Sequence, residues 1–143
     1  IVYVDKIESN SAIKVGIKTG TALPMYCTGM GKAILAFLPE ETQNEIMNNT
    51  SFQMRTEKTL PSREALIDQL KLVRKNGYAK DGEEFVDGLI SFAAPIFDFR
   101  NNPLAALSIS MPKLRYNEEE NREYYVSLVK NTASVLSKEL GKR

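Results

Sequence analysis

Histidine is absent from this 143-residue sequence, and cysteine occurs once, at Cys27. The common zinc sites need several Cys or His ligands, and Ser-His and Cys-His catalytic sites need the imidazole, so both kinds of site are excluded. A single cysteine cannot form a disulfide within the chain, which favours a reducing compartment, the cytoplasm. We expect no metal site and no cofactor.

Long apolar runs and an excess of either charge are also missing. The apolar stretches are short and interrupted by charged residues, which predicts neither a transmembrane helix nor a signal peptide. The net charge is +1, whereas nucleic-acid-binding modules usually carry a basic stripe. We therefore expect this chain to contact neither DNA nor a membrane. Because a strand-like pattern begins at residue 1, we expect a fragment, or a true beginning further upstream.

The composition that remains, 43% hydrophobic and 26% charged, is typical of one globular domain with a single core. β-branched and alternating residues predict a hairpin over residues 1–18, with its turn at residues 8–11. Two further strands are expected over residues 89–99 and 104–111, joined by a turn at residues 100–103.

Helical spacing and cap residues predict four helices, over residues 29–38 after the cap Thr28, from residue 40 after Pro39, from Ser62 to the stop at Gly77, and from Asn117 onward. Asn117 and Glu120 are spaced as in a capping box. The apolar side of this last helix is expected to run through Tyr125, Leu128, Thr132, Val135 and Leu136. Helices and strands without strict βαβ alternation predict an α+β fold, an antiparallel sheet with helices on its faces.

A glycine-rich helix start, CTGMGKA at residues 27–33, is the first candidate site. Two glycines in the first turn let backbone N–H groups approach an anion such as a carboxylate. The spacing before Lys32 is too short for a phosphate loop. Alternatively, Gly29 and Gly31 only permit tight packing of the helix on the sheet, and spacing alone favours this interpretation.

Asp81 is the second candidate, because it lies beside a glycine in a predicted turn between a helix and a strand. Its oxygens would accept hydrogen bonds from the hydroxyl groups of a sugar acid or hydroxy acid. The alternative is a solvated turn charge. That alternative is preferred for Glu83 and Glu84 and carries about equal weight for Asp81.

Serines on two neighbouring strands are the third candidate. Alternation places Ser108 and Ser110 on one face of their strand, and Ser91 shares a face with Leu89 on the preceding strand. The three hydroxyl groups could converge. Two polar positions among apolar residues favour a hydrogen-bonding ligand site over an open solvent face.

A catalytic set is not recognisable. Without histidine, only the helix start or Lys32 could activate Cys27, so a buried, inert thiol is expected. Glu83 and Glu84 are adjacent, so in an extended segment their carboxylates point apart.

Five motifs together resemble, in order and spacing, the C-terminal domain of IclR-type bacterial transcription regulators: IVYVDKIES at residues 1–9, CTGMGKAILA at 27–36, GYAKDGEEF at 77–85, AAPIFD at 93–98 and AALSIS at 105–110. The resemblance covers essentially the whole chain. It implies a GAF-like fold, with a curved antiparallel sheet and a ligand pocket between one sheet face and the helix above it.

The resemblance also implies the residues of that pocket. Backbone amides at Gly29 and Met30 would hold the carboxylate of a small organic acid, so Lys32 would not be its main partner. The positions matching the other family ligand-binding residues are Asp81, Leu89, Ser91, Ser108 and Ser110. Three of the positions depart from the common pattern: Gly29 replaces a common alanine, Ser91 a cysteine of some members, and Met30 a smaller residue.

By resemblance, residues 1–143 form a small-molecule sensor rather than an enzyme, and the winged helix-turn-helix that binds DNA is an N-terminal domain absent from this chain. Family members are usually homodimers or homotetramers, and exposed apolar residues such as Leu140 could form the interface. Two alternatives stay open: a GAF-like enzyme that uses Cys27, and a dimerisation module with a vestigial pocket. Keto acids, sugar acids and aromatic acids all fit the carboxylate requirement.

Overall fold

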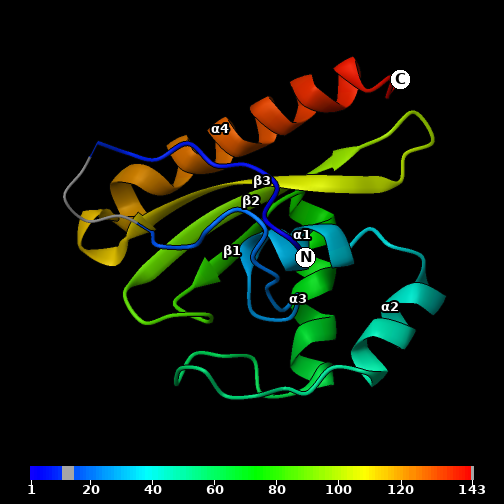
Figure 1. Ribbon diagram of the computed structural model, residues 1–143, viewed down its shortest axis with the longest axis horizontal. Helices are drawn as coiled ribbons and strands as arrows, with labels where there is room; N and C mark the ends of the chain where they lie inside the picture. Colours follow the sequence, from blue (N-terminus) through cyan, green and yellow to red (C-terminus); the bar gives the residue numbers. More distant parts are fainter. Residues whose placement is uncertain (11–14, 143) are drawn as a thin grey trace.

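A three-stranded antiparallel sheet separates two layers of helices in the computed structural model, which describes residues 1–10 and 15–142 (Figure 1). In chain order the elements are α1 (Gly29–Leu35), α2 (Glu40–Asn48), α3 (Arg63–Asn76), β1 (Ala79–Gly82), β2 (Leu89–Phe97), β3 (Pro103–Pro112), the 3-10 helix η1 (Lys113–Arg115) and α4 (Glu118–Glu139). The strand order is β1-β2-β3, and both pairs are antiparallel. The predicted α+β class and the two long strands are confirmed.

Alternation along β2 assigns its side chains to the two helical layers. Ile90, Phe92 and Ala94 pack with Val129 and Ala133 of α4. The opposite face carries α1, behind which α3 buries its predicted apolar stripe, Leu66, Leu70 and Val73. Because both faces are covered, β2 is buried along nearly its whole length.

Side-chain caps determine where most of the helices begin. Thr28 and Ser62 accept hydrogen bonds from backbone N–H groups three residues on, and Gly77 ends α3 with φ +76°. These predictions are confirmed. Asn117 is the N-cap, as expected, but it does not form a capping box with Glu120. Its side chain accepts from Glu119 N at 3.0 Å, and its backbone N–H donates to Asn121 Oδ1 at 3.1 Å.

The first helix is shorter than predicted. It ends at Leu35, and residues 36–38 continue as tighter turns in which Leu38 N donates to Leu35 O. Pro39 disfavours the helical conformation of the residue before it, so the chain leaves the helix ahead of the proline.

The predicted N-terminal hairpin is wrong in its pairing. Residues 1–3 pair with residues 21–23, with Val2 opposite Ala22, and residues 15–18 are not a strand. Part of the predicted second strand, residues 11–14, lies outside the described residues. Alternation correctly marks extended chain near residue 1, but it contains no information about which segment becomes its partner.

The buried side of α4 also differs from the prediction. Val129, Ala133 and Ser137 face the sheet, while Val135 and Leu136 are 58% and 41% exposed. The small side chains let α4 approach β2 so closely that Phe97 N donates to Ser137 Oγ at 2.9 Å. Hydrophobicity alone therefore selected the wrong side of the helix.

In the described part of the chain, no helix is long and apolar enough to cross a membrane.

Candidate ligand-binding site

The sheet register brings four of the predicted site residues together on one face. Asp81 of β1 lies opposite Ser91 of β2, which lies opposite Ser110 of β3, and this row crosses the whole sheet. Directly paired residues of an antiparallel sheet share a face and lie about 5 Å apart. In the next row on this face, Ser108 lies opposite Ala93. Asp81 and Ser91 are buried, and the other two serines are half-buried.

The start of α1 lies directly above this row. A Cβ atom added to Gly29 would lie 2.9 Å from Ser91 Oγ and 3.3 Å from Ala93 Cβ, so the helix backbone nearly touches the sheet here. Among the described residues, the amide N–H groups of Gly29 and Met30 have no hydrogen-bond acceptor, whereas Gly31 N donates to Thr28 Oγ1 at 3.2 Å. Two backbone donors are therefore free beside the polar row.

Gly31 has a different role from Gly29. A Cβ atom at residue 31 would lie 2.4 Å from Met25 Cα and 2.6 Å from Met25 O. Backbone atoms cannot move aside as the hydroxyl of Ser91 can. The packing interpretation of the glycine pair is therefore correct for Gly31.

Replacing Gly31 with alanine is expected to destabilise the fold by about 1–3 kcal/mol through this overlap. Gly16→Ala is the matched control, because a Cβ atom there meets nothing within 4 Å. Urea unfolding of both variants measures the difference. Equal stabilities of the two variants would contradict the tight contact between Gly31 and Met25.

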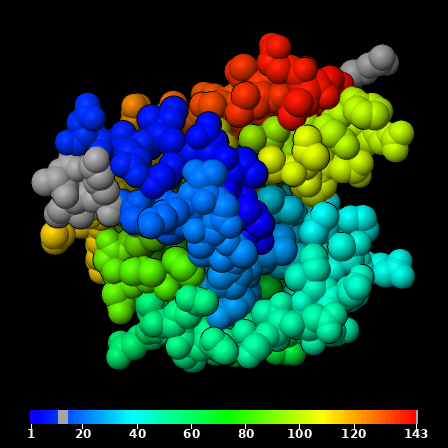
Figure 2. Space-filling view, in the orientation of Figure 1, coloured from blue at the N-terminus to red at the C-terminus, as the bar shows by residue number. Residues whose placement is uncertain are grey.

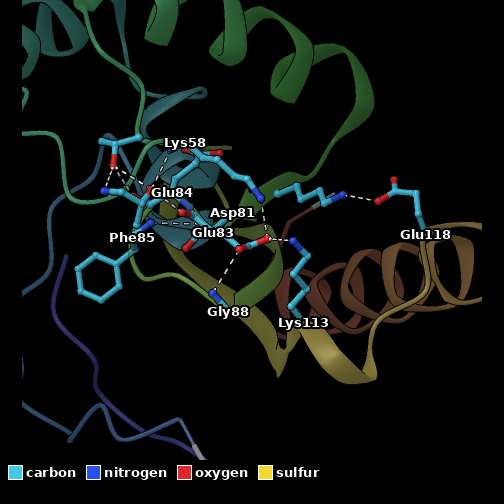
Figure 3. A network of polar contacts seen from close by, with 11 residues as sticks. Lys58, Asp81, Glu83, Glu84, Phe85, Gly88, Lys113 and Glu118 are labelled. Atoms are coloured by element: carbon cyan, nitrogen blue, oxygen red, sulfur yellow. Dashed lines mark hydrogen bonds and ion pairs between the residues drawn. The ribbon is translucent and has the colours of Figure 1, made fainter.

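Asp81 lies in strand β1, not in a turn as predicted. Its Oδ1 accepts hydrogen bonds from Glu84 N at 2.7 Å and Phe85 N at 3.4 Å, and so closes the loop between β1 and β2 (Figure 3). Burial raises the pKa of the carboxyl group to about 6, although the bond from Glu84 N acts in the opposite direction. Asp81 therefore holds the loop between β1 and β2 and carries a carboxyl group that ionises less readily than an exposed one.

The prediction that Glu83 and Glu84 are solvated turn charges is wrong. Glu84 Oε1 lies 2.5 Å from Nζ of Lys32, which is completely buried. Glu83 lies between Lys58 and Lys113, and hydrogen bonds from these lysines lower its pKa to about 2 (Figure 3). The lysine partners are distant in sequence, so a local pattern could not reveal them. Lys32 is engaged with Glu84, which agrees with the expectation that it is not a ligand's main partner.

Tyr3 is a residue near the site that the sequence analysis missed. Burial raises the pKa of its phenol, a hydrogen bond to Ser108 lowers it, and the charge of Asp81 raises it, so the phenol lies close to both groups. Figure 2 shows the N-terminal segment, in blue, lying on the surface beside the residues that lead into α1. No motif in the sequence connects residue 3 with residue 108.

Cys27 has the properties of an inert thiol, as expected. It is fully buried, and this burial raises the pKa of the thiol to about 11. Reactive cysteines have the opposite properties, a lowered pKa and access to solvent. The predicted alternative of a cysteine-dependent enzyme therefore has no support from this side chain.

A hollow of about 230 Å³ opens beside the polar row. It is lined by Leu89 and Pro112, which lie opposite each other in the row next to Ser91 and Ser110, and by residues 15–17 and 85–88. Of the seven predicted site residues, Leu89 lines this hollow and the other six do not. The structure therefore assembles the polar groups and places an opening at their edge.

Comparison with known proteins assigns the family. The family described as "Bacterial transcriptional regulator IclR C-terminal" matches residues 1–138. The HTH-type transcriptional regulator KdgR of Escherichia coli (strain K12) is 37% identical over 141 residues, 99% of this chain and 53% of KdgR. The chain spans about half the length of the curated relatives it matches.

Two solved structures extend the comparison to the fold. The crystal structure of Thermotoga maritima IclR matches 98% of this chain and 56% of its own, with 35% identity and a TM-score of 0.93. A double mutant of the PobR inducer binding domain from Acinetobacter, in complex with 3-hydroxybenzoic acid, matches 86% of this chain and 72% of its own, with 26% identity and a TM-score of 0.78. The fold is GAF-like, as the resemblance implied. The chain belongs to the family of bacterial transcriptional regulator IclR C-terminal domains.

Proposed function

We propose that residues 1–143 bind a small organic acid and thereby control DNA binding by a regulator whose DNA-binding domain, a winged helix-turn-helix, lies outside this chain. The observation that carries the proposal is the convergence of Asp81, Ser91 and Ser110 in one row beneath the free amides of Gly29 and Met30. Polar groups from four elements, α1, β1, β2 and β3, meet there. Such convergence is typical of ligand sites.

The carboxylate of the acid would accept hydrogen bonds from the amides of Gly29 and Met30. Its other oxygens would meet the hydroxyl groups of Ser91, Ser108 and Ser110. The Asp81 carboxyl, with a pKa of about 6, is mostly ionised at pH 7.5 and accepts from a ligand hydroxyl. A second carboxylate beside it would be repelled, so the acid end of the ligand points to α1 and its hydroxyl or carbonyl end to the sheet.

The PobR complex supports this class of ligand, because 3-hydroxybenzoic acid is a small organic acid that carries a carboxylate and a hydroxyl group. Keto acids and sugar acids have the same two features. Leu89 provides an apolar wall at the opening of the site, and the packing of this wall would distinguish among these acids.

Control of DNA binding requires that the acid bind two arrangements of the regulator unequally. A homodimer or homotetramer provides such arrangements. Val135 and Leu136 of α4, and Leu140 directly after it, are exposed to solvent at 58%, 41% and 45%. Apolar residues grouped in this way suit contact with a second subunit. The curated relatives are transcription regulators, which supports a sensor rather than an enzyme.

Thermal unfolding with 3-hydroxybenzoate, pyruvate and a sugar acid tests the proposal. At a hundredfold excess over its dissociation constant, a bound acid should stabilise the domain by about 3 kcal/mol. The double variant Ser108→Ala/Ser110→Ala should lose this stabilisation, and Ser127→Ala, on the exposed side of α4, should keep it. A wild-type response in the double variant would show that the site is wrongly assigned. No response to any acid would favour a dimerisation module with a vestigial pocket.

A further inference from the structure

A second hollow, of about 470 Å³, lies between the end of α3, the end of β2 and the C-terminal half of α4. None of the residues proposed to bind the acid lines it. Its volume is within the range of small-molecule sites. The residues that line it carry only positive charges, whereas the chain as a whole is nearly neutral.

Five basic residues and no acidic residue line this hollow in the described part of the chain: Arg74, Lys75, Lys130, Lys138 and Lys142. Since the whole chain has a net charge of +1, the remaining residues carry a net charge of −4. Within residues 1–10 and 15–142, no ion pair joins any of the five to a carboxylate. The hollow is therefore a local concentration of uncompensated positive charge.

Helix dipoles account for only part of this charge. Arg74 and Lys75 lie in the last turn of α3, and Lys138 in the last turn of α4, where cations offset the negative helix end. Each helix end corresponds to roughly half a negative charge, so two ends balance about one of the five cations. Most of the positive charge is left for another partner.

The geometry of the cations is partly fixed in advance. Arg74 Nε donates to Ala36 O at 2.8 Å, and Lys130 Nζ donates to Asn76 O at 2.8 Å. Lys142 Nζ lies 3.8 Å from the centre of the Phe97 ring. Phe97 meets Phe37 edge to face at 5.1 Å, which gives the hollow an apolar wall. The hollow therefore combines an aromatic wall, Phe37 and Phe97, with basic side chains at its other sides.

We propose that this hollow is a second ligand site, for a small anion with two or more negative charges, such as a phosphate ester. Four of the five cations are lysines, which bind phosphate as point charges, and several must act together to hold one ligand. A monocarboxylate would use only one or two of them. The site is distinct from the organic-acid site, because the two share no residue.

Binding of inorganic pyrophosphate to the 143-residue chain, measured by calorimetry at low salt, tests the proposal. Lys138→Gln/Lys142→Gln is expected to weaken binding about tenfold or more, and added salt to weaken it further. The double variant avoids Arg74 and Lys130, whose side chains also donate hydrogen bonds to backbone carbonyl groups. Lys18→Gln/Lys71→Gln is the matched control, since it removes the same charge from exposed positions outside the hollow. The control should bind like the wild type.

Several results would overturn the proposal. Equal weakening in both double variants would mean diffuse attraction, and absence of pyrophosphate binding to the wild type would leave no site. Binding of duplex DNA but not of pyrophosphate, or loss of subunit association in Lys138→Gln/Lys142→Gln, would assign the hollow to a macromolecular interface. Ser108→Ala/Ser110→Ala should bind pyrophosphate normally, so loss of binding in that variant would place the anion in the organic-acid site instead.

Discussion

Replacing Lys32 with methionine is expected to lower the free energy of unfolding by about 3–5 kcal/mol, the usual cost of removing one partner of a buried ion pair. Lys32 is completely buried, and its Nζ lies 2.5 Å from Glu84 Oε1. Within the described residues, Glu84 Oε2 is buried and has no hydrogen-bond partner. Methionine fills similar space but leaves this carboxylate without its counter-charge.

The compensating variant separates charge from packing. Lys32→Met/Glu84→Leu removes both charges and should recover most of the lost stability, because paired apolar side chains often replace a buried ion pair without loss. Lys71→Met is the control, since Lys71 and Asp68 form a pair whose side chains are 71% and 75% exposed, and a loss below about 1 kcal/mol is expected there. Urea unfolding measures all three variants. A single Lys32→Met variant as stable as the control would contradict the role given to the ion pair.

The second large effect is a pH dependence caused by Asp81. Its folded-state pKa of about 6 exceeds the ordinary value of 3.8 because the carboxyl is buried. The folded state therefore binds this proton more tightly than the unfolded state. The destabilisation is complete above pH 6 and disappears as the pH falls towards 4. About two pKa units correspond to about 3 kcal/mol.

Asp81→Asn isolates this effect, because the amide keeps the oxygen that accepts from Glu84 N but cannot ionise. The free energy of unfolding of the wild type, minus that of Asp81→Asn, should rise by up to about 3 kcal/mol between pH 7.5 and pH 4. Asp68→Asn, at an exposed position, is the control. Urea unfolding at four pH values gives the comparison. A difference that does not change with pH would mean that burial does not perturb Asp81.

Local signals in the sequence predicted the parts of the fold that depend on neighbouring residues. The caps Thr28 and Ser62, the stop at Gly77 and the two faces of β2 all follow from short-range chemistry. The convergence of Ser91, Ser108 and Ser110 followed from period-two alternation once two strands were expected to be neighbours. These elements position the candidate site.

Features that depend on distant partners could not be predicted. Glu84 looked like a surface charge because its partner Lys32 is 52 residues away. Tyr3 reaches Ser108 only because residues 1–3 pair with residues 21–23, and alternation does not select a partner. The sheet-facing side of α4 includes Ala133 and Ser137, and a search for strongly hydrophobic residues does not select such small side chains. Five ordered motifs supplied the family, which no single motif could do.

An amide NMR titration of the ¹⁵N-labelled chain with 3-hydroxybenzoate, pyruvate and a sugar acid tests the proposed organic-acid site most directly. Two backbone donors, at Gly29 and Met30, are proposed to receive the carboxylate. Their amide resonances should shift most with the acid that binds, and residues of β1, β2 and β3 around Asp81, Ser91 and Ser110 should follow. Saturable shifts that leave Gly29 and Met30 unchanged, or that centre on other elements, would contradict the site proposed here.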